Sequence, residues 1–333
     1  MDKNKLLKRI AVFTGVSLTA MHVFNRISTY IATADNLLGA DDYNVYDWKY
    51  GKISYKKKGA GTPLLLIHNF NVFSSSHEWN KIIDHFSATN TVYSIDLLGC
   101  GCSERPILTY TNFLYVQLLT DFIKNVIGEK TDVIVSRDSS PFVLMTCAND
   151  DTLIDRIIMI NPQSLVSLAK VPSKQSKLLK NILYMPVIGT FIYNIKTRKS
   201  IIYERFTSAY FYNQNKVNEK DILGCFESSH RNKSHSKYVY ACQKLGYTNA
   251  NISFCLGKLK NKITIIIGND NPENILSANQ YQNQIPEIEI IGIDHAKMLP
   301  HVEKSDEFIE IVKPLLEKSV SYTHLTLPTK RIV

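Results

Sequence analysis

The six cysteines of this 333-residue chain include no Cys-x-x-Cys pair, and none stands at a metal-ligand spacing from a histidine. This absence argues against a metal site, and no feature of the sequence requires a cofactor. Cys100 and Cys102 are separated by one residue in a predicted tight loop, a poor geometry for a mutual disulfide. We therefore expect reduced, partly buried thiols in a reducing compartment.

The sequence also lacks a basic stripe with interleaved aromatic residues. Its net charge of +9 is spread along the chain as isolated lysines and arginines, apart from Lys56-Lys57-Lys58. Nucleic-acid binding is therefore not expected, and a mild attraction to anionic surfaces is the modest inference. With 44% hydrophobic and 21% charged residues, the composition is that of a globular protein with one large or two modest domains.

No long apolar run is found, although an uncharged stretch covers residues 10–25. Lys3, Lys5, Lys8 and Arg9 precede it and Arg26 follows it. The stretch is sixteen residues long, whereas a spanning helix needs about twenty. Three interpretations remain: an amphipathic or packing helix before the main domain, a short membrane anchor, or a cleaved signal.

The same stretch sets the expected location. We expect a cytoplasmic protein, or one associated with a membrane surface through residues 1–26. If the helix spans a membrane, its basic end should remain inside and the domain should lie outside. Six cysteines argue mildly against that second location.

The last residues of the chain, 319–333, are excluded from the fold prediction. Residues 321–330 read SYTHLTLPTK and resemble a translated sequencing adapter. His324 is therefore not a catalytic candidate. A predicted amphipathic helix over 306–318 precedes this segment.

Short apolar runs alternate with helical patterns in the remainder of the chain. A hairpin is predicted over 48–59, strands over 64–68, 91–96, 132–136, 156–160, 263–268 and 288–291, and helices over 74–86, 111–128 and 141–149. This alternation predicts right-handed crossovers and a mostly parallel sheet. Residues 163–259 are rich in Tyr, Lys and Ser and predict an inserted, mainly helical cap on a core formed by 41–162 and 260–318.

Two motifs carry a family resemblance. PLLLIHNF begins at Pro63, and DLLGCGCSERP begins at Asp96, about thirty residues later. The pair resembles the α/β-hydrolase fold family, in which the equivalents read His-Gly-Phe and Asp-x-x-Gly-x-Gly-x-Ser. The resemblance covers about 46–317 and implies a mostly parallel sheet with helices on both faces and an inserted helical cap. Within the family, the chain resembles uncharacterised hydrolase-like proteins of anaerobic Gram-positive bacteria.

The resemblance places the nucleophile at Asp138. Family nucleophiles occupy a strained strand-to-helix turn with small residues on both sides. Here Ser136 and Ser140 take the small positions, and frames centred on Ser139 or Ser140 fit less well. An aspartate can form an alkyl-enzyme ester, which a water molecule activated by a general base must then cleave.

The position of the general base departs from the family pattern. The family reads His-x-Pro-x-x-Glu, whereas this chain reads MLPHVE from Met298, so the base position holds a residue that cannot take a proton. His295 is the candidate that could replace it, although His295 and His301 are also expected simply to bond to backbone or water. The orienting acid is expected at Asp270, because Asn271 occupies the usual acid position.

The resemblance also implies an oxyanion loop at His68-Asn69-Phe70, where Asn69 replaces a glycine. The backbone N–H groups of Phe70 and Ser139 are its expected donors. Asparagine tolerates a positive φ better than most residues, so Asn69 can in principle replace the glycine.

Two functions follow from these residues. The first is a hydrolase of a small, fairly apolar ester-like or haloalkane-like substrate, bound between the core and the tyrosine-rich cap. The second is a catalytically inactive binding or interaction protein on the same scaffold. Both imply a small-molecule partner, and the sequence predicts no oligomeric state.

Overall fold

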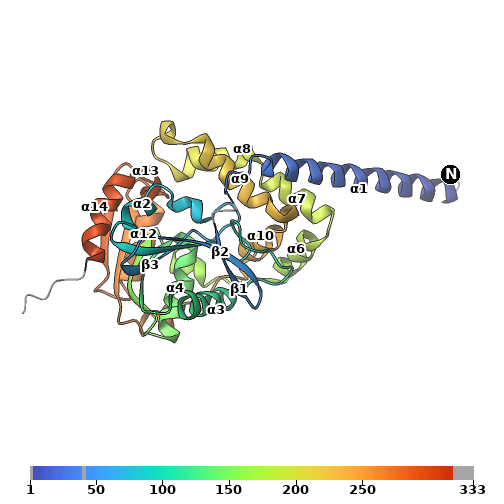
Figure 1. The fold of residues 1–333 in the computed structure, drawn as a ribbon. Coiled ribbons are helices and arrows are strands. Elements are labelled where there is room, and N and C mark those ends of the chain that lie inside the picture. The colour runs from blue at the N-terminus through green and yellow to red at the C-terminus, as the bar shows by residue number, and fades with distance from the viewer. Residues whose placement is uncertain (1–2, 40–42, 318–333) are drawn as a thin grey trace, which may run out of the picture.

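One eight-stranded sheet forms the centre of the molecule, in the order β1-β2-β4-β3-β5-β6-β7-β8 (Figure 1). The computed structural model describes residues 3–39 and 43–317, so the excluded segment 319–333 lies outside the described residues. The strands are β1 (Asn44–Trp48), β2 (Gly51–Lys58), β3 (Thr62–Ile67), β4 (Asn90–Ile95), β5 (Thr131–Ser136), β6 (Ile154–Ile160), β7 (Lys262–Gly268) and β8 (Glu289–Ile293). The hairpin β1–β2 and the pair β2–β4 are antiparallel and all other pairs are parallel, which confirms the predicted sheet.

The parallel strands are apolar on both faces because helices cover both. Leu65 and Ile67 of β3 belong to one buried cluster with α3 (Asn112–Phe122) and α4 (Ser140–Asn149). Leu64 and Leu66 belong to another with α2 (Ile83–Phe86) and α14 (Ser305–Leu316). The alternation along one strand is the period-2 pattern of a sheet buried on both sides.

The prediction of one continuous helix over 74–86 is wrong. The segment forms a 3₁₀ turn, Ser76–Trp79, and then the short helix α2. Asp96 accepts the backbone N–H of Ser76 at 2.6 Å, and Glu78 accepts that of Asn69 at 3.0 Å. These long-range hydrogen bonds fix the segment in place and override its local helical period.

A helical cap fills the segment between β6 and β7. Its helices are α5 (Leu165–Leu168), α6 (Lys174–Tyr184), α7 (Ile188–Lys196), α8 (Lys199–Arg205), α9 (Glu219–Ser234), α10 (Lys237–Lys244) and α11 (Ser253–Leu256). The buried guanidinium of Arg105, from the second sequence motif, ties the cap to the core. It donates to Ser103 O at 2.7 Å in the core, and to Ser236 Oγ at 2.7 Å and Ser228 O at 3.0 Å in the cap.

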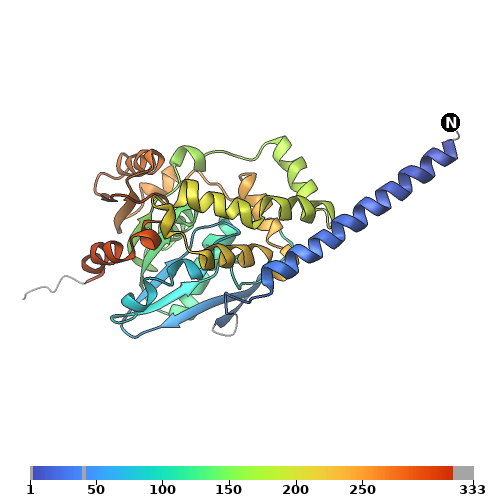
Figure 2. The same cartoon turned by 90° about the horizontal axis from the view of Figure 1, so that it is seen from above.

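The N-terminal segment is one long helix, α1 (Lys3–Thr33), of 31 residues. Its first part projects away from the rest of the molecule, and its last part lies along the cap (Figure 2). Asn25 donates to Val187 O at 3.1 Å, and Phe24 packs edge-on against Phe191 at 5.3 Å. By length and composition α1 could cross a membrane, a test that signal sequences also pass.

Candidate functional site

The turn after β5 carries the predicted nucleophile. β5 ends at Ser136, and a 3₁₀ turn over Arg137–Ser139 leads directly into α4. The strained residue of this turn is Arg137, whose φ is 44°, and Asp138 follows it half-buried. In the family the nucleophile itself occupies the strained position of this turn, whereas here the left-handed residue is Arg137, one position before Asp138.

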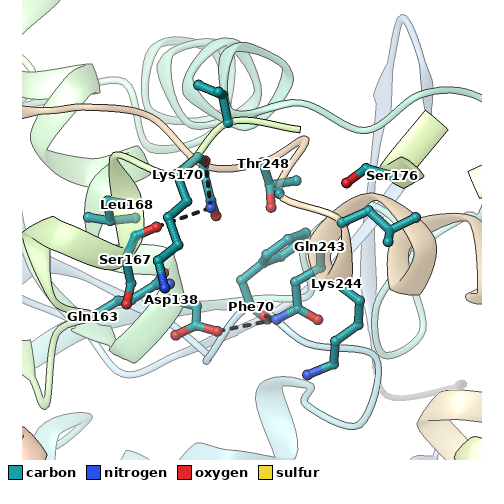
Figure 3. A pocket seen from close by; sticks show the side chains of 14 residues that line it. Phe70, Asp138, Gln163, Ser167, Leu168, Lys170, Ser176, Gln243, Lys244 and Thr248 are labelled. Atoms are coloured by element: carbon teal, nitrogen blue, oxygen red, sulfur yellow. Dashed lines mark hydrogen bonds between the residues drawn. The ribbon is translucent and has the colours of Figure 1, made fainter. Parts of the chain in front are cut away.

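Asp138 is held by one side chain from the cap and one from the core. Its Oδ2 accepts a hydrogen bond of 3.2 Å from the Gln243 amide, and its backbone N–H donates to Asn69 Oδ1 at 3.2 Å. The same Gln243 nitrogen also donates to the carbonyl of Phe70 (Figure 3). Gln243 therefore joins the predicted nucleophile and the predicted oxyanion loop through a single amide group.

The position of Gln243 follows from the way α10 ends. Gln243 and Lys244 occupy the last turn of this helix, and Gly246 follows with a φ of 79°. Tyr247 N–H bonds back to Cys242 O at 2.9 Å, which closes the helix end. The earlier residues Val239 and Ala241 are buried, and Val239 packs against Gly99 of the core.

A cavity of about 420 Å³ opens above Asp138, and its lining is mostly polar. It lies between the α5–α6 region and the end of α10, with Phe70 and Asp138 contributed by the core. Its polar lining residues are Asp138, Gln163, Ser167, Lys170, Ser176, Gln243, Lys244, Thr248 and Asn249. The lining of this cavity differs from the apolar, tyrosine-rich site that was expected. A smaller and mostly apolar cavity lies at Asn69 of the predicted oxyanion loop, with Tyr210 and Leu299 also in its lining.

Several tyrosines of the cap pack against one another and do not line this cavity. Tyr184 packs edge-on against Tyr238 at 4.8 Å, and Tyr193 packs against Tyr240 at 5.5 Å, so these rings form the interior of the cap. Their number in the sequence reflects packing within the cap. It does not indicate the chemistry of the cavity.

Two lysines give the cavity a net positive charge. Lys170 and Lys244 line it together with the single carboxylate of Asp138. Desolvation and the nearby charge of Arg205 lower the pKa of Lys244, and the charge of Asp138 opposes that shift. A ligand that brings a negative group is favoured by this balance of charges.

The side chains and carbonyl groups of the predicted oxyanion loop form hydrogen bonds within the protein. His68 is buried; its Nε2 accepts Leu97 N–H at 3.0 Å, so its Nδ1 donates to Asn69 O at 2.8 Å. Ser139 Oγ donates to His68 O at 2.6 Å. Asn69 is not among the described non-glycine residues with positive φ, and its amide oxygen takes up the N–H of Asp138.

The candidate base and acid do not line the Asp138 cavity. His295 is exposed, its ring packs 5.1 Å from that of Tyr212, and it lines a different hollow with Glu303 and Lys304. Asp270 is also exposed, and Asn271 caps α12 (Pro272–Gln282).

The loop that carries Met298 is pinned in place. Asn161 Nδ2 donates to the carbonyls of Lys297 and Met298 at 3.0 Å each, and Met298 N–H donates to Tyr210 O at 3.1 Å. This tethering opposes the rearrangement that His295 would need to act as a base for Asp138.

His301 has a structural partner that the sequence analysis missed. It is fully buried in the short helix α13 (Pro300–Glu303), and its Nε2 lies 2.9 Å from Glu78 Oε1. Burial alone would raise the pKa of Glu78, but the hydrogen bond and charge of His301 and the Asn69 N–H hold it below its usual range. The expectation that His301 bonds only to backbone or water is therefore wrong.

The sequence did not predict a role in this site for four residues. Gln243, Lys244 and Lys170 belong to the cap, where no family motif assigns a role to any position. Glu78 lies in the segment predicted as an ordinary helix. Among the described residues, no group of three or more His, Cys, Asp or Glu side chains could hold a metal ion.

Comparisons with known proteins identify hydrolases as similar in sequence over a short region. A 2-hydroxy-6-oxo-6-(2'-aminophenyl)hexa-2,4-dienoic acid hydrolase of Metapseudomonas resinovorans is 32% identical over 71 residues, which is 21% of this chain and 24% of the relative. A haloalkane dehalogenase of Mesorhizobium japonicum is 35% identical over 71 residues, 21% of this chain and 23% of the relative. The matches thus span about a quarter of the length of these relatives. No family model matches the chain.

Solved structures match over most of the chain. A serine hydrolase involved in carbazole degradation (TM-score 0.68, 15% identity) covers 82% of this chain and 98% of its own. An epoxide hydrolase (TM-score 0.66, 18% identity) covers 82% and 99%. A membrane phospholipase A (TM-score 0.64, 13% identity) covers 94% and 98%. These similarities confirm the predicted α/β-hydrolase fold.

Proposed function

We propose that the chain is a non-catalytic α/β-hydrolase-fold protein that binds a small, polar, negatively charged molecule in the cavity above Asp138. The observation that carries this proposal is the composition of that cavity. No histidine is among the described residues that line it, and Gln243 from the cap binds the Asp138 carboxylate.

Hydrolysis through Asp138 would require a base for the second step. Attack by the carboxylate on a carbon centre forms an ester and releases the leaving group, and a water molecule must then be deprotonated to cleave that ester. The family base position holds Met298, and the exposed His295 lies on a loop that is tethered at Lys297 and Met298. Without a base, an ester formed at Asp138 would remain on the protein.

The ligand class follows from the lining. Lys170 and Lys244 favour an anion, and the amide and hydroxyl groups around them offer further hydrogen bonds. A volume of about 420 Å³ accommodates a small molecule. Figure 3 shows Lys170 and Lys244 entering the cavity from the two cap segments, with Asp138 between the ends of their side chains in this view.

A thermal-shift screen tests this proposal. Full-length protein would be heated with a panel of small carboxylates, each paired with the neutral amide of the same shape. A carboxylate present at about 100 times its Kd should stabilise the fold by roughly 2.7 kcal/mol, and its amide should do so far less. The shift should disappear in the variant Lys170→Gln/Lys244→Gln. Equal shifts with acids and amides, or an unchanged shift in the variant, would overturn the ligand class.

A hydrolase remains the second candidate because Asp138 faces the cavity at the expected turn. The short sequence match includes a haloalkane dehalogenase and the solved structures include an epoxide hydrolase, and an aspartate nucleophile suits either type of substrate. This candidate requires His295, with Asp270 as its orienting acid, to reach the cavity. It predicts turnover that depends on Asp138.

We further propose that α1 attaches the protein to a membrane. Its exposed apolar side chains include Leu7, Val12, Phe13 and Val16, and the first part of the helix projects away from the rest of the described protein. The membrane phospholipase A structure aligns with 94% of this chain, compared with 82% for the carbazole-pathway hydrolase. This proposal combines the packing helix and the membrane anchor that the sequence suggested, because one end of α1 packs on the cap while the other extends away from it.

A further inference from the structure

A second and larger cavity lies where α1 meets the cap. Its volume is about 860 Å³, and α1, the α6–α7 corner and the region between α9 and α10 line it. Its charged or polar lining side chains include Arg26 and Thr29 from α1, and Lys233, His235 and Lys237 from the cap. The cavity does not share a lining residue with the Asp138 cavity.

This cavity concentrates positive charge that nothing in the described protein neutralises. Arg26, Lys233 and Lys237 line it, and its lining contains no carboxylate from residues 3–39 or 43–317. Among the described residues, Arg26 and Lys233 form no ion pair. Lys237 is 2% exposed, and its Nζ donates to Met185 O at 2.8 Å and to Thr190 Oγ1 at 3.0 Å. The same Nζ lies 5.0 Å from the centre of the Tyr238 ring, so Lys237 adds positive charge to the wall of the cavity.

Lys233 reaches the cavity through a strained break in α9. Asn232, Lys233 and Ser234 have φ values of 51°, 57° and 60°, a run of left-handed residues that contains no glycine. Ser234 Oγ lies 3.2 Å from Thr29 Oγ1, so the break is fastened to α1. Strain of this kind persists only where surrounding contacts impose it, and it is common at binding sites.

The position of the cavity along α1 matches the depth of membrane phosphates. The uncharged stretch from 10 to 25 rises by about 24 Å, slightly less than a hydrocarbon core of about 30 Å. Arg9 and Arg26 flank it, and long basic side chains at helix ends extend to the headgroups. A membrane crossed by α1 would therefore place its phosphates at the level of Arg26.

The adjacent face of the cap suits the same environment. α6 packs on α7, which in turn packs on α1. α6 exposes Leu178 and Leu179, and it also carries Lys174, Lys177 and Lys180. Exposed leucines beside lysines are typical of a helix that lies on a membrane surface.

We propose that the cavity between α1 and the cap binds the phosphate of an anionic membrane phospholipid, an inference that rests on the proposed membrane attachment through α1. The negative phosphate would contact Arg26 and Lys233, and the charge of Lys237 would add to the attraction. A zwitterionic headgroup would bring its own cation into a cavity that already carries three positive side chains, so the site should prefer lipids without that cation.

Lipid retention measures this preference directly. Full-length protein would be reconstituted in bilayers of equal parts phosphatidylglycerol and phosphatidylcholine with matched acyl chains, and retained lipids would be counted by native mass spectrometry. Wild-type protein should retain phosphatidylglycerol about tenfold over phosphatidylcholine. The variant Arg26→Gln/Lys233→Gln should lose that preference. The control variant Lys260→Gln/Lys262→Gln removes the same amount of charge from the exposed surface, away from the cavity, and should keep the preference.

Flotation with vesicles of each lipid separates the two proposals. Protein that floats with both lipids but retains them equally would overturn the headgroup site and leave the anchor intact. Protein that floats with neither would overturn the anchor, and the site with it. If free glycerol phosphate displaces the retained lipid at concentrations equal to those of the lipid, the site binds soluble anions and the lipid assignment fails.

Discussion

Replacing His301 with alanine is expected to lower the free energy of unfolding by about 3–5 kcal/mol, the usual cost of leaving a buried charged group without its partner. Glu78 would remain buried with its Oε1 unpaired, because that oxygen now lies 2.9 Å from His301 Nε2. The lost ring also contacts Trp79 at 5.0 Å and Phe308 at 5.8 Å, so a cavity adds to the cost. Thermal unfolding should show a drop in Tm on the order of 10 °C.

A double-mutant cycle separates the charge from the packing. Glu78→Gln/His301→Ala removes the unpaired carboxylate and should be more stable than His301→Ala alone. The unfolding free energy of the single variant Glu78→Gln completes the cycle. A cost below about 1 kcal/mol for His301→Ala would mean that the pair contributes little, as an exposed ion pair does.

The variant Gln243→Glu is expected to push the cap away from Asp138 at neutral pH. It keeps the shape of the side chain but replaces the amide nitrogen, which now donates to Asp138 Oδ2 and Phe70 O, with a second negative oxygen. Two charges about 4 Å apart repel by about 4 kcal/mol at an effective dielectric constant of 20. Both side chains are half-buried, so solvent reduces the expected loss of stability to about 2–3 kcal/mol.

The pH dependence of this variant identifies the cause. Each carboxylate raises the pKa of the other, and protonation of either one removes the repulsion. The stability deficit relative to wild type should therefore shrink as the pH falls from 7 towards 4. The variant Asp138→Asn/Gln243→Glu should show little deficit at any pH, whereas a deficit that persists in it would show that Gln243 does not act through Asp138.

The core of the fold could be predicted because its determinants are local. An apolar strand that ends in His68, and a second strand followed by a loop of fixed glycine and serine positions, are readable from residue types alone. The failure at 74–86 has a different origin. Ser76 and Glu78 form hydrogen bonds to Asp96 and Asn69, and contacts between such distant positions leave no mark on helical periodicity.

The cavity was harder to predict because the cap builds most of it. Many tyrosines suggested an apolar site, but four of them form two packed pairs inside the cap, Tyr184 with Tyr238 and Tyr193 with Tyr240. Gln243 binds Asp138 from 105 positions further along the chain, and no spacing rule connects the two. By contrast, the prediction that Met298 occupies the family's base position comes directly from the sequence. In the structure, Asn161 and Tyr210 tether the loop around it.

The measurement that tests the central claim most directly is turnover by full-length protein. Fluorogenic esters and short haloalkanes would be supplied to wild type and to Asp138→Ala, which removes the predicted nucleophile while Asn69 can still accept the backbone N–H at that position. A non-catalytic protein predicts equal rates for both, at the level of the uncatalysed reaction. Hydrolysis by wild type at least about tenfold faster than by Asp138→Ala, a difference of roughly 1.4 kcal/mol in barrier, would contradict it.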